Sequence, residues 1–96
     1  MNSVQKVAAF LLIIGLEKGK KVMALMDSGE IKNIVAELNK LSELSPTIQE
    51  HVRNEFGQMG YETDMSPADT LYVLRQLFNG SKISNSNKEK NAYRKM

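Results

Sequence analysis

Hydrophobic positions recur every three or four residues along most of this 96-residue chain, a spacing typical of amphipathic helices. The first apolar stretch is nearly continuous from Val7 to Gly15 and is too short to cross a bilayer, which requires about 20 residues. Its Val, Ile and Phe content would also suit a buried strand. The 3-4-3 spacing of apolar residues from Val4 to Ile14 favours a helix instead, with Ser3 as N-cap and Gly15 as its stop.

Residues 17–26 predict a second and more strongly amphipathic helix. Val22, Met23 and Met26 fall on one face, whereas the lysines of this segment lie largely off it. Gly19 lies inside the helix and costs about 1 kcal/mol relative to alanine. We therefore expect this helix to be the least stable of the first four.

Three further helices are predicted from their start signals. Asp27 and Glu30 are three residues apart, as in a capping box, and open a third helix whose apolar face continues to Leu41. Ser45-Pro46 and Ser66-Pro67 each place a serine at the N-cap and a proline at the first helical position. We interpret the glycines that follow residue 56 as the fraying end of the fourth helix.

The links between these helices are short, so consecutive helices are expected to be neighbours in space. The sequence thus predicts an all-α, single compact domain over residues 1–80, with about five short helices stacked as helical hairpins. Residues 81–96 form a basic polar tail or linker. Within it, residues 81–91 have Ile83 as their only large apolar residue, and we expect them to be disordered. Residues 91–96 could form a helical turn under a partner or a following domain.

Little in the sequence points to catalysis or metal binding. There is no cysteine, and His51 is the only histidine, so thiolate and multi-histidine metal sites are excluded. Two pairs of carboxylates, Glu50 with Glu55 and Glu62 with Asp64, could be imagined as catalytic. Neither pair has an apolar setting that would raise the pKa of one member. None of the glycines forms a phosphate-binding loop. We predict a protein that is not an enzyme and has no cofactor and no metal.

The net charge of +2 is unevenly distributed. Residues 1–80 carry a net charge of −2, whereas residues 81–96 carry +4. The predicted domain is therefore a poor surface for nucleic acid, and only the tail leaves a nucleic-acid accessory role open. The N-terminus lacks a signal-peptide cleavage pattern, so we predict a cytoplasmic protein without direct membrane insertion.

Six methionines are a high share for this length, and methionine suits both irregular cores and adaptable docking grooves. We predict a groove that a partner helix completes with anchors at i, i+3, i+4 and i+7, and expect about half of its residues to be plain core. Self-association through this face is also expected. The predicted groove consists of Val22, Met23, Met26, Val35, Leu38, Phe56 and Met59.

Four segments in this order resemble the N-terminal domain of the flagellar motor switch protein FliG. The stretch Lys6-Val7-Ala8-Ala9-Phe10-Leu11-Leu12-Ile13-Ile14-Gly15 is similar to the opening K-A-A-I-L-L-L-x-L-G of that domain. The segments that begin at Met26, Leu44 and Leu71 resemble its later helices. The likeness spans about residues 3–80. Because the middle and C-terminal domains of the family are absent from this sequence, we expect either a domain of a longer protein or a stand-alone divergent relative.

The resemblance implies an armadillo-like helical fold and a scaffold role in the flagellar C ring. In that family the domain lies at the cytoplasmic face of the inner membrane, clasps the C-terminal helical tail of the MS-ring protein FliF, and assembles into a ring. The same fold would also suit a soluble adaptor or regulator that binds another protein helix. The FliF tail and a helix of another protein are therefore the two candidate partners.

Overall fold

The computed structural model of the chain describes residues 1–41 and 44–83. These residues form helices without any strand, which confirms the predicted all-α fold for the part of the chain described. The five helices are α1 (Ser3–Ile14), α2 (Leu16–Met23), α3 (Ser28–Lys40), α4 (Pro46–Gln58) and α5 (Pro67–Gln76).

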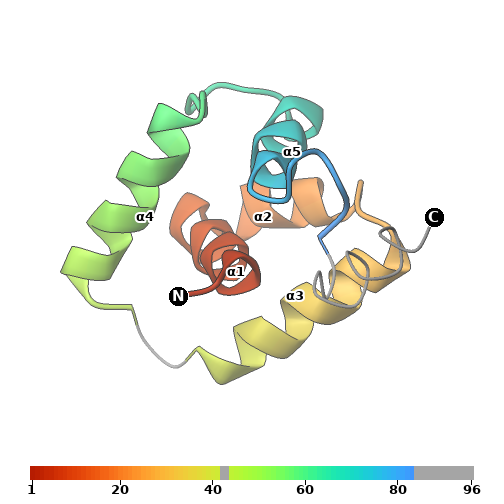
Figure 1. Cartoon of the computed structure of the whole chain (residues 1–96), viewed down its shortest axis with the longest axis horizontal. Coiled ribbons are helices and arrows are strands. Elements are labelled where there is room, and N and C mark those ends of the chain that lie inside the picture. Colours follow the sequence, from red (N-terminus) through yellow and green to blue (C-terminus); the bar gives the residue numbers. More distant parts are fainter. Residues whose placement is uncertain (42–43, 84–96) are drawn as a thin grey trace.

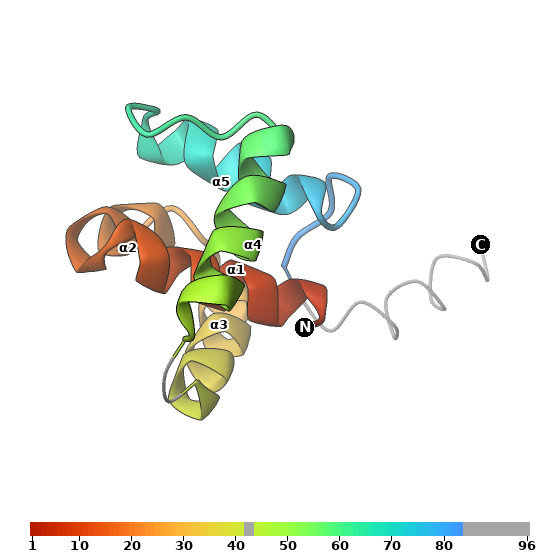
Figure 2. The same cartoon turned by 90° about the vertical axis from the view of Figure 1, so that its left-hand side faces the viewer.

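Helix α1 is the centre of the domain. It makes the most extensive contacts with α3 and also packs against α4 and α2, and α5 covers α2. Figure 1 shows α1 nearly end-on, with α4, α3 and α5 on different sides of it. Figure 2 shows α4 crossing α1, with α3 and α5 at opposite ends of the view. The near-continuous apolar run of α1 follows from this position, because a helix covered on several sides needs apolar residues around most of its circumference.

The start signals read from the sequence operate as expected at three helices. Asp27 forms the capping box with Glu30, and the side chains of Ser45 and Ser66 each accept a hydrogen bond from an amide in the first turn of α4 and α5. The prediction for α1 was wrong by one residue. Its N-cap is Asn2, whose side chain accepts from the amide of Gln5 in a second capping box. An asparagine with Gln at N3 satisfies the first-turn amides in the same way as the Ser/Thr form.

The helix predicted over residues 17–26 is shorter than expected and ends at Met23. It follows α1 after one residue, Gly15, whose φ of 100° is accessible to glycine at little cost. Gly19 is buried, and a Cβ there would lie 3.2 Å from the carbonyl oxygen of Leu11. The glycine therefore permits close packing of α2 on the backbone of α1, a benefit that the propensity argument did not consider.

The segment after α5 returns to the domain. Asn79 takes a left-handed conformation with φ of 56° and ends the helix together with Gly80. The Ile83 side chain is fully buried, and its amide donates a 3.0 Å hydrogen bond to the Glu30 carboxylate. The sequence had placed Ile83 in a polar tail with too little apolar area to fold. Residues 84–96, including the helical turn expected at 91–96, lie outside the described residues.

An aromatic cluster joins α1, α4 and the loop that follows α4. The Phe10 ring lies 4.4 Å from the Phe56 ring and 4.7 Å from the Tyr61 ring, centroid to centroid, the second pair edge-to-face. Such pairs contribute about 0.5–1.5 kcal/mol beyond the apolar area that they bury. The Lys6–Glu55 ion pair, at 3.0 Å, joins the same two helices at the surface.

Candidate functional site

The structure distributes the predicted groove between the core and the surface. Core residues, with relative exposures of 2%, 7% and 0%, are Val22, Met26 and Phe56. Half-buried residues packed against the core are Met23, Leu38 and Met59. Val35 is 40% exposed. Four of the seven thus have surface available to a partner, and the other three hold the domain together.

The reason is the central position of α1. Helices α2, α3 and α4 all pack against it, so each turns its most apolar face towards α1. A 3-4 spacing of apolar residues shows that a face is buried, but it does not show whether the domain or a partner buries it. Phe56 illustrates the point, because its ring packs at a tilt against the ring of Phe10 of α1.

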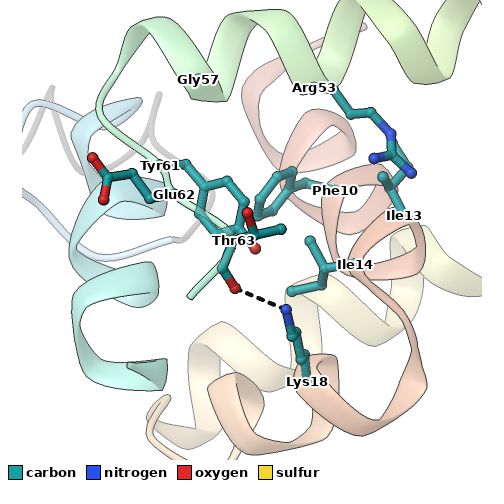
Figure 3. A pocket seen from close by; sticks show the side chains of 9 residues that line it. All are labelled: Phe10, Ile13, Ile14, Lys18, Arg53, Gly57, Tyr61, Glu62 and Thr63. Atoms are coloured by element: carbon teal, nitrogen blue, oxygen red, sulfur yellow. Dashed lines mark hydrogen bonds between the residues drawn. The ribbon is translucent and has the colours of Figure 1, made fainter. Parts of the chain in front are cut away.

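The structure also contains a pocket that the sequence did not predict, which we call the α1–α4 pocket. Its volume is about 430 Å³, within the range of ligand sites in proteins. Its floor is formed by apolar side chains of α1 and by the Tyr61 ring, and α4 forms one wall (Figure 3). The residues that line it are Phe10, Ile13, Ile14, Lys18, Arg53, Gly57, Tyr61, Glu62 and Thr63.

The end of α4 positions Tyr61 over this floor. The Tyr61 amide donates to the carbonyl of Phe56 at 2.9 Å, and the Gly60 amide donates to that of Gly57 at 3.1 Å. Together with the φ of 108° at Gly60, these bonds define a Schellman motif. The motif turns the chain so that the Tyr61 ring meets the edge of Phe10. The expected fraying end of the fourth helix is therefore a well-defined cap.

Gly57 forms part of the pocket wall. It is a helical residue outside the left-handed region, and a Cβ built on it would meet no atom within 4 Å. Neither backbone conformation nor close packing therefore requires glycine here, unlike at Gly60 and Gly19. Glycine in a helix costs up to about 1 kcal/mol relative to alanine. The open space beside this residue is the pocket itself.

Two cations border the pocket. Lys18 reaches from α2 and donates a 2.8 Å hydrogen bond to the carbonyl oxygen of Thr63, and Arg53 extends from α4 beside Ile13 (Figure 3). Neither forms an ion pair with an acidic group of the described residues. The nearby Glu62 directs its carboxylate away from the pocket (Figure 3). The entrance therefore carries two cations without an ion pair among the described residues, above an apolar floor.

Tyr61 completes the polar part of the pocket. Burial raises the pKa of its hydroxyl, and the positive charge of Arg53 opposes this rise. The phenol is therefore neutral at physiological pH and can both donate and accept a hydrogen bond. An apolar floor, a neutral hydroxyl and two cations suit the binding of a ligand that has both apolar and polar parts.

A smaller hollow of about 370 Å³ lies beside α5. Leu25 and Tyr72, at 50% and 68% exposure, project at its edge. Arg75 also lines it, but the guanidinium of this residue is bound to Glu30. This hollow therefore offers apolar contact without a charged group free to orient a ligand.

Of the residues considered for catalysis or metal binding, Glu50, His51 and Asp64 are exposed. Within residues 1–41 and 44–83 no group of three or more His, Asp or Glu side chains could hold a metal ion. Over the same ranges, no helix has the length and hydropathy required to span a membrane. The sequence had read Gly57 only as part of a helix end, and it had read Phe10, Ile13 and Ile14 only as part of an apolar run.

Comparison with known proteins agrees with the resemblance found in the sequence. The family model described as the FliG N-terminal domain matches residues 1–85. No curated protein and no solved structure matches the chain. The matched range includes all five helices and Ile83, the buried residue that the sequence had assigned to the tail. The chain therefore belongs to the FliG N-terminal domain family and is a component of the flagellar motor switch.

Proposed function

We propose that this chain is a non-enzymatic scaffold that docks the C-terminal helical tail of the MS-ring protein FliF and supports assembly of the C ring. The observation that carries the proposal is the family match over residues 1–85. In this proposal the domain lies at the cytoplasmic face of the inner membrane, and neighbouring copies associate around the ring. It acts through its helical surface and requires no cofactor.

The character of the surface supports this proposal. Leu16 is 75% exposed, and Leu12 and Leu25 are each 50% exposed, so several large apolar side chains are available for contact with protein. The sequence offers no pattern that combines a nucleophile, a base and an orienting group at workable spacing. A domain with exposed apolar helix faces and no catalytic constellation is suited to binding another helix.

The four accessible residues of the predicted groove are our candidates for part of this contact. Met23, Leu38 and Met59 are half-buried, and Val35 is exposed. Val35 is the most informative of them, because its side chain contributes least to the core. A charge introduced there faces water in the free domain and meets apolar atoms only when a partner covers it.

The test is a titration of the full chain with a synthetic peptide of the FliF C-terminal tail, followed by calorimetry. We expect wild-type protein to bind, and Val35→Glu and Met23→Glu to weaken binding at least tenfold without loss of helical circular dichroism. Lys32→Glu, an exposed change of charge on α3, is the control and should bind like wild type. Absence of binding by the wild-type chain would contradict the proposed function. If folded Val35→Glu and Met23→Glu bind as well as wild type, only these two residues are ruled out as contacts and the proposed function stands.

A further inference from the structure

The α1–α4 pocket has three properties that the fold itself does not require. It is open although its floor consists of apolar side chains, including Ile13 and Ile14, which are only half-buried. It has a helical glycine in its wall with no neighbour near its missing Cβ. It is bordered by Lys18 and Arg53, which have no acidic partner among the described residues. None of the seven residues of the predicted groove lines it.

The glycine indicates that the space is used. Alanine would have been accommodated at position 57 and would have favoured the helix. Alanine would also have narrowed the pocket. Because glycine has no side chain, another chain can approach the backbone of α4 closely at this position.

The charges indicate what approaches. An apolar floor accepts an aliphatic or aromatic side chain, and the two cations favour carboxylates beside it. Glu62 does not neutralise them, since its carboxylate points away from the pocket (Figure 3). The preferred occupant is therefore an apolar residue that has acidic residues close to it on the same helix.

We propose that the α1–α4 pocket is an anchor site for a partner helix. It receives one large apolar side chain of that helix, and Lys18 and Arg53 pair with carboxylates on its adjacent turns. The proposal rests on the proposed function, because it places the FliF tail as the helix that supplies the anchor. It also adds a second contact area, on the side of α1 that faces α4, to the one predicted from the sequence.

The first experiment uses two helical glycines as a matched pair. Gly57→Leu fills the pocket, whereas Gly29→Leu makes the same change in α3, where a Cβ has only an ordinary contact with Asp27. Both variants replace glycine with a better helix former, so neither should lower the melting temperature. We expect the FliF-tail peptide to bind Gly57→Leu at least tenfold more weakly than wild type, and Gly29→Leu unchanged.

The second experiment tests the charges with a partner-independent probe. Titration with 3-phenylpropionate, an apolar ring with a carboxylate, should shift the NMR methyl signals of Ile13 and Ile14. The neutral 3-phenylpropanol should shift them less at equal concentration. Arg53→Glu should reduce the shift with phenylpropionate at least threefold, and Lys20→Glu, an exposed change on α2 that does not line the pocket, should not.

The outcomes separate this proposal from the proposed function. If the peptide binds wild type and Gly57→Leu equally, the anchor site is wrong and the scaffold function stands. If phenylpropionate leaves both isoleucine signals unchanged, or the neutral alcohol acts equally well, the assignment of an acidic anchor is also overturned. If the peptide does not bind wild type, the proposed function fails and this proposal fails with it.

Discussion

Two regions of this small domain treat polar groups in opposite ways. The Glu30 carboxylate is only 1% exposed, and hydrogen-bond donors surround it. Arg75 donates two hydrogen bonds to it, at 2.9 and 2.6 Å, and the amides of Asp27 and Ile83 donate two more. Around the α1–α4 pocket, two cations have no acidic partner among the described residues, and an apolar floor is left partly open.

The difference separates what holds the fold from what remains available to a partner. A buried carboxylate is tolerated only when its hydrogen bonds are made, so the Glu30 network fixes the start of α3, the end of α5 and the returning segment relative to one another. A cation at an open pocket remains hydrated and carries no such penalty. Changes in the first region should therefore act on stability, and changes in the second on binding.

The largest effect is expected from Arg75→Ala. This change leaves Glu30 buried without its cation, and removal of one partner of a buried pair costs about 3–5 kcal/mol. Urea denaturation followed by circular dichroism measures the loss. The control is Lys6→Ala, since Lys6 and Glu55, 3.0 Å apart, have side chains that are 30% and 38% exposed. That surface pair should contribute less than about 1 kcal/mol. Equal losses in the two variants would contradict the distinction between the regions.

A second and somewhat smaller effect is expected from Ile83→Ala. The side chain is fully buried, and truncation of a buried isoleucine costs about 2–4 kcal/mol. Ile48→Ala, at a position with 38% exposure on α4, should cost less than about 1 kcal/mol. A cost for Ile83→Ala as small as that of Ile48→Ala would show that the returning segment is not part of the folded unit in solution.

Acid should weaken the Glu30 region selectively. Burial alone would raise the pKa of Glu30, but hydrogen bonds from Arg75 and from the amides of Ile83 and Asp27 outweigh burial and lower it. The pKa of Asp27 is lowered by the Glu30 amide and by Lys82. A carboxylate with a lowered pKa in the folded state stabilises above its ordinary value, 4.5 for Glu30, and this stability is lost as the pH falls through the folded value.

The expected result is a free energy of unfolding that falls with decreasing pH below about 4.5 in wild type, by a smaller amount than Arg75→Ala costs at pH 7. Urea titrations at several pH values measure it. In Glu30→Gln, which cannot titrate at this position, the slope should be shallower. An identical slope in wild type and Glu30→Gln would assign the acid sensitivity to other carboxylates.

Much of the fold was predictable because its signals are local. The Asp27–Glu30 capping box, the two Ser-Pro starts and the stop at Gly15 each depend on residues a few positions apart. Ile83 escaped prediction because its burial depends on Glu30, which lies 53 residues earlier in the chain. Similarly, the benefit of Gly19 depends on the backbone of Leu11 in another helix.

The candidate site was less predictable than the fold. Apolar periodicity identified core residues such as Phe56 and partly exposed residues such as Met59 alike. It did not distinguish between the two kinds. The α1–α4 pocket combines residues of α1, α2, α4 and the following loop. No single stretch of sequence carries this combination, and only the packing of α1 against α4 brings it together.

The smallest expected effect has the opposite sign and tests the open region directly. Gly57→Ala should stabilise the free domain by up to about 1 kcal/mol, because alanine favours the helix and its Cβ enters open space. Gly29→Ala should give a similar gain, which sets the scale for a helical glycine without a structural role. Thermal and urea denaturation of both variants measure the gains. A loss of stability in Gly57→Ala, with the expected gain in Gly29→Ala, would show that the fold itself requires Gly57. The glycine would then give no support to a partner that enters the pocket.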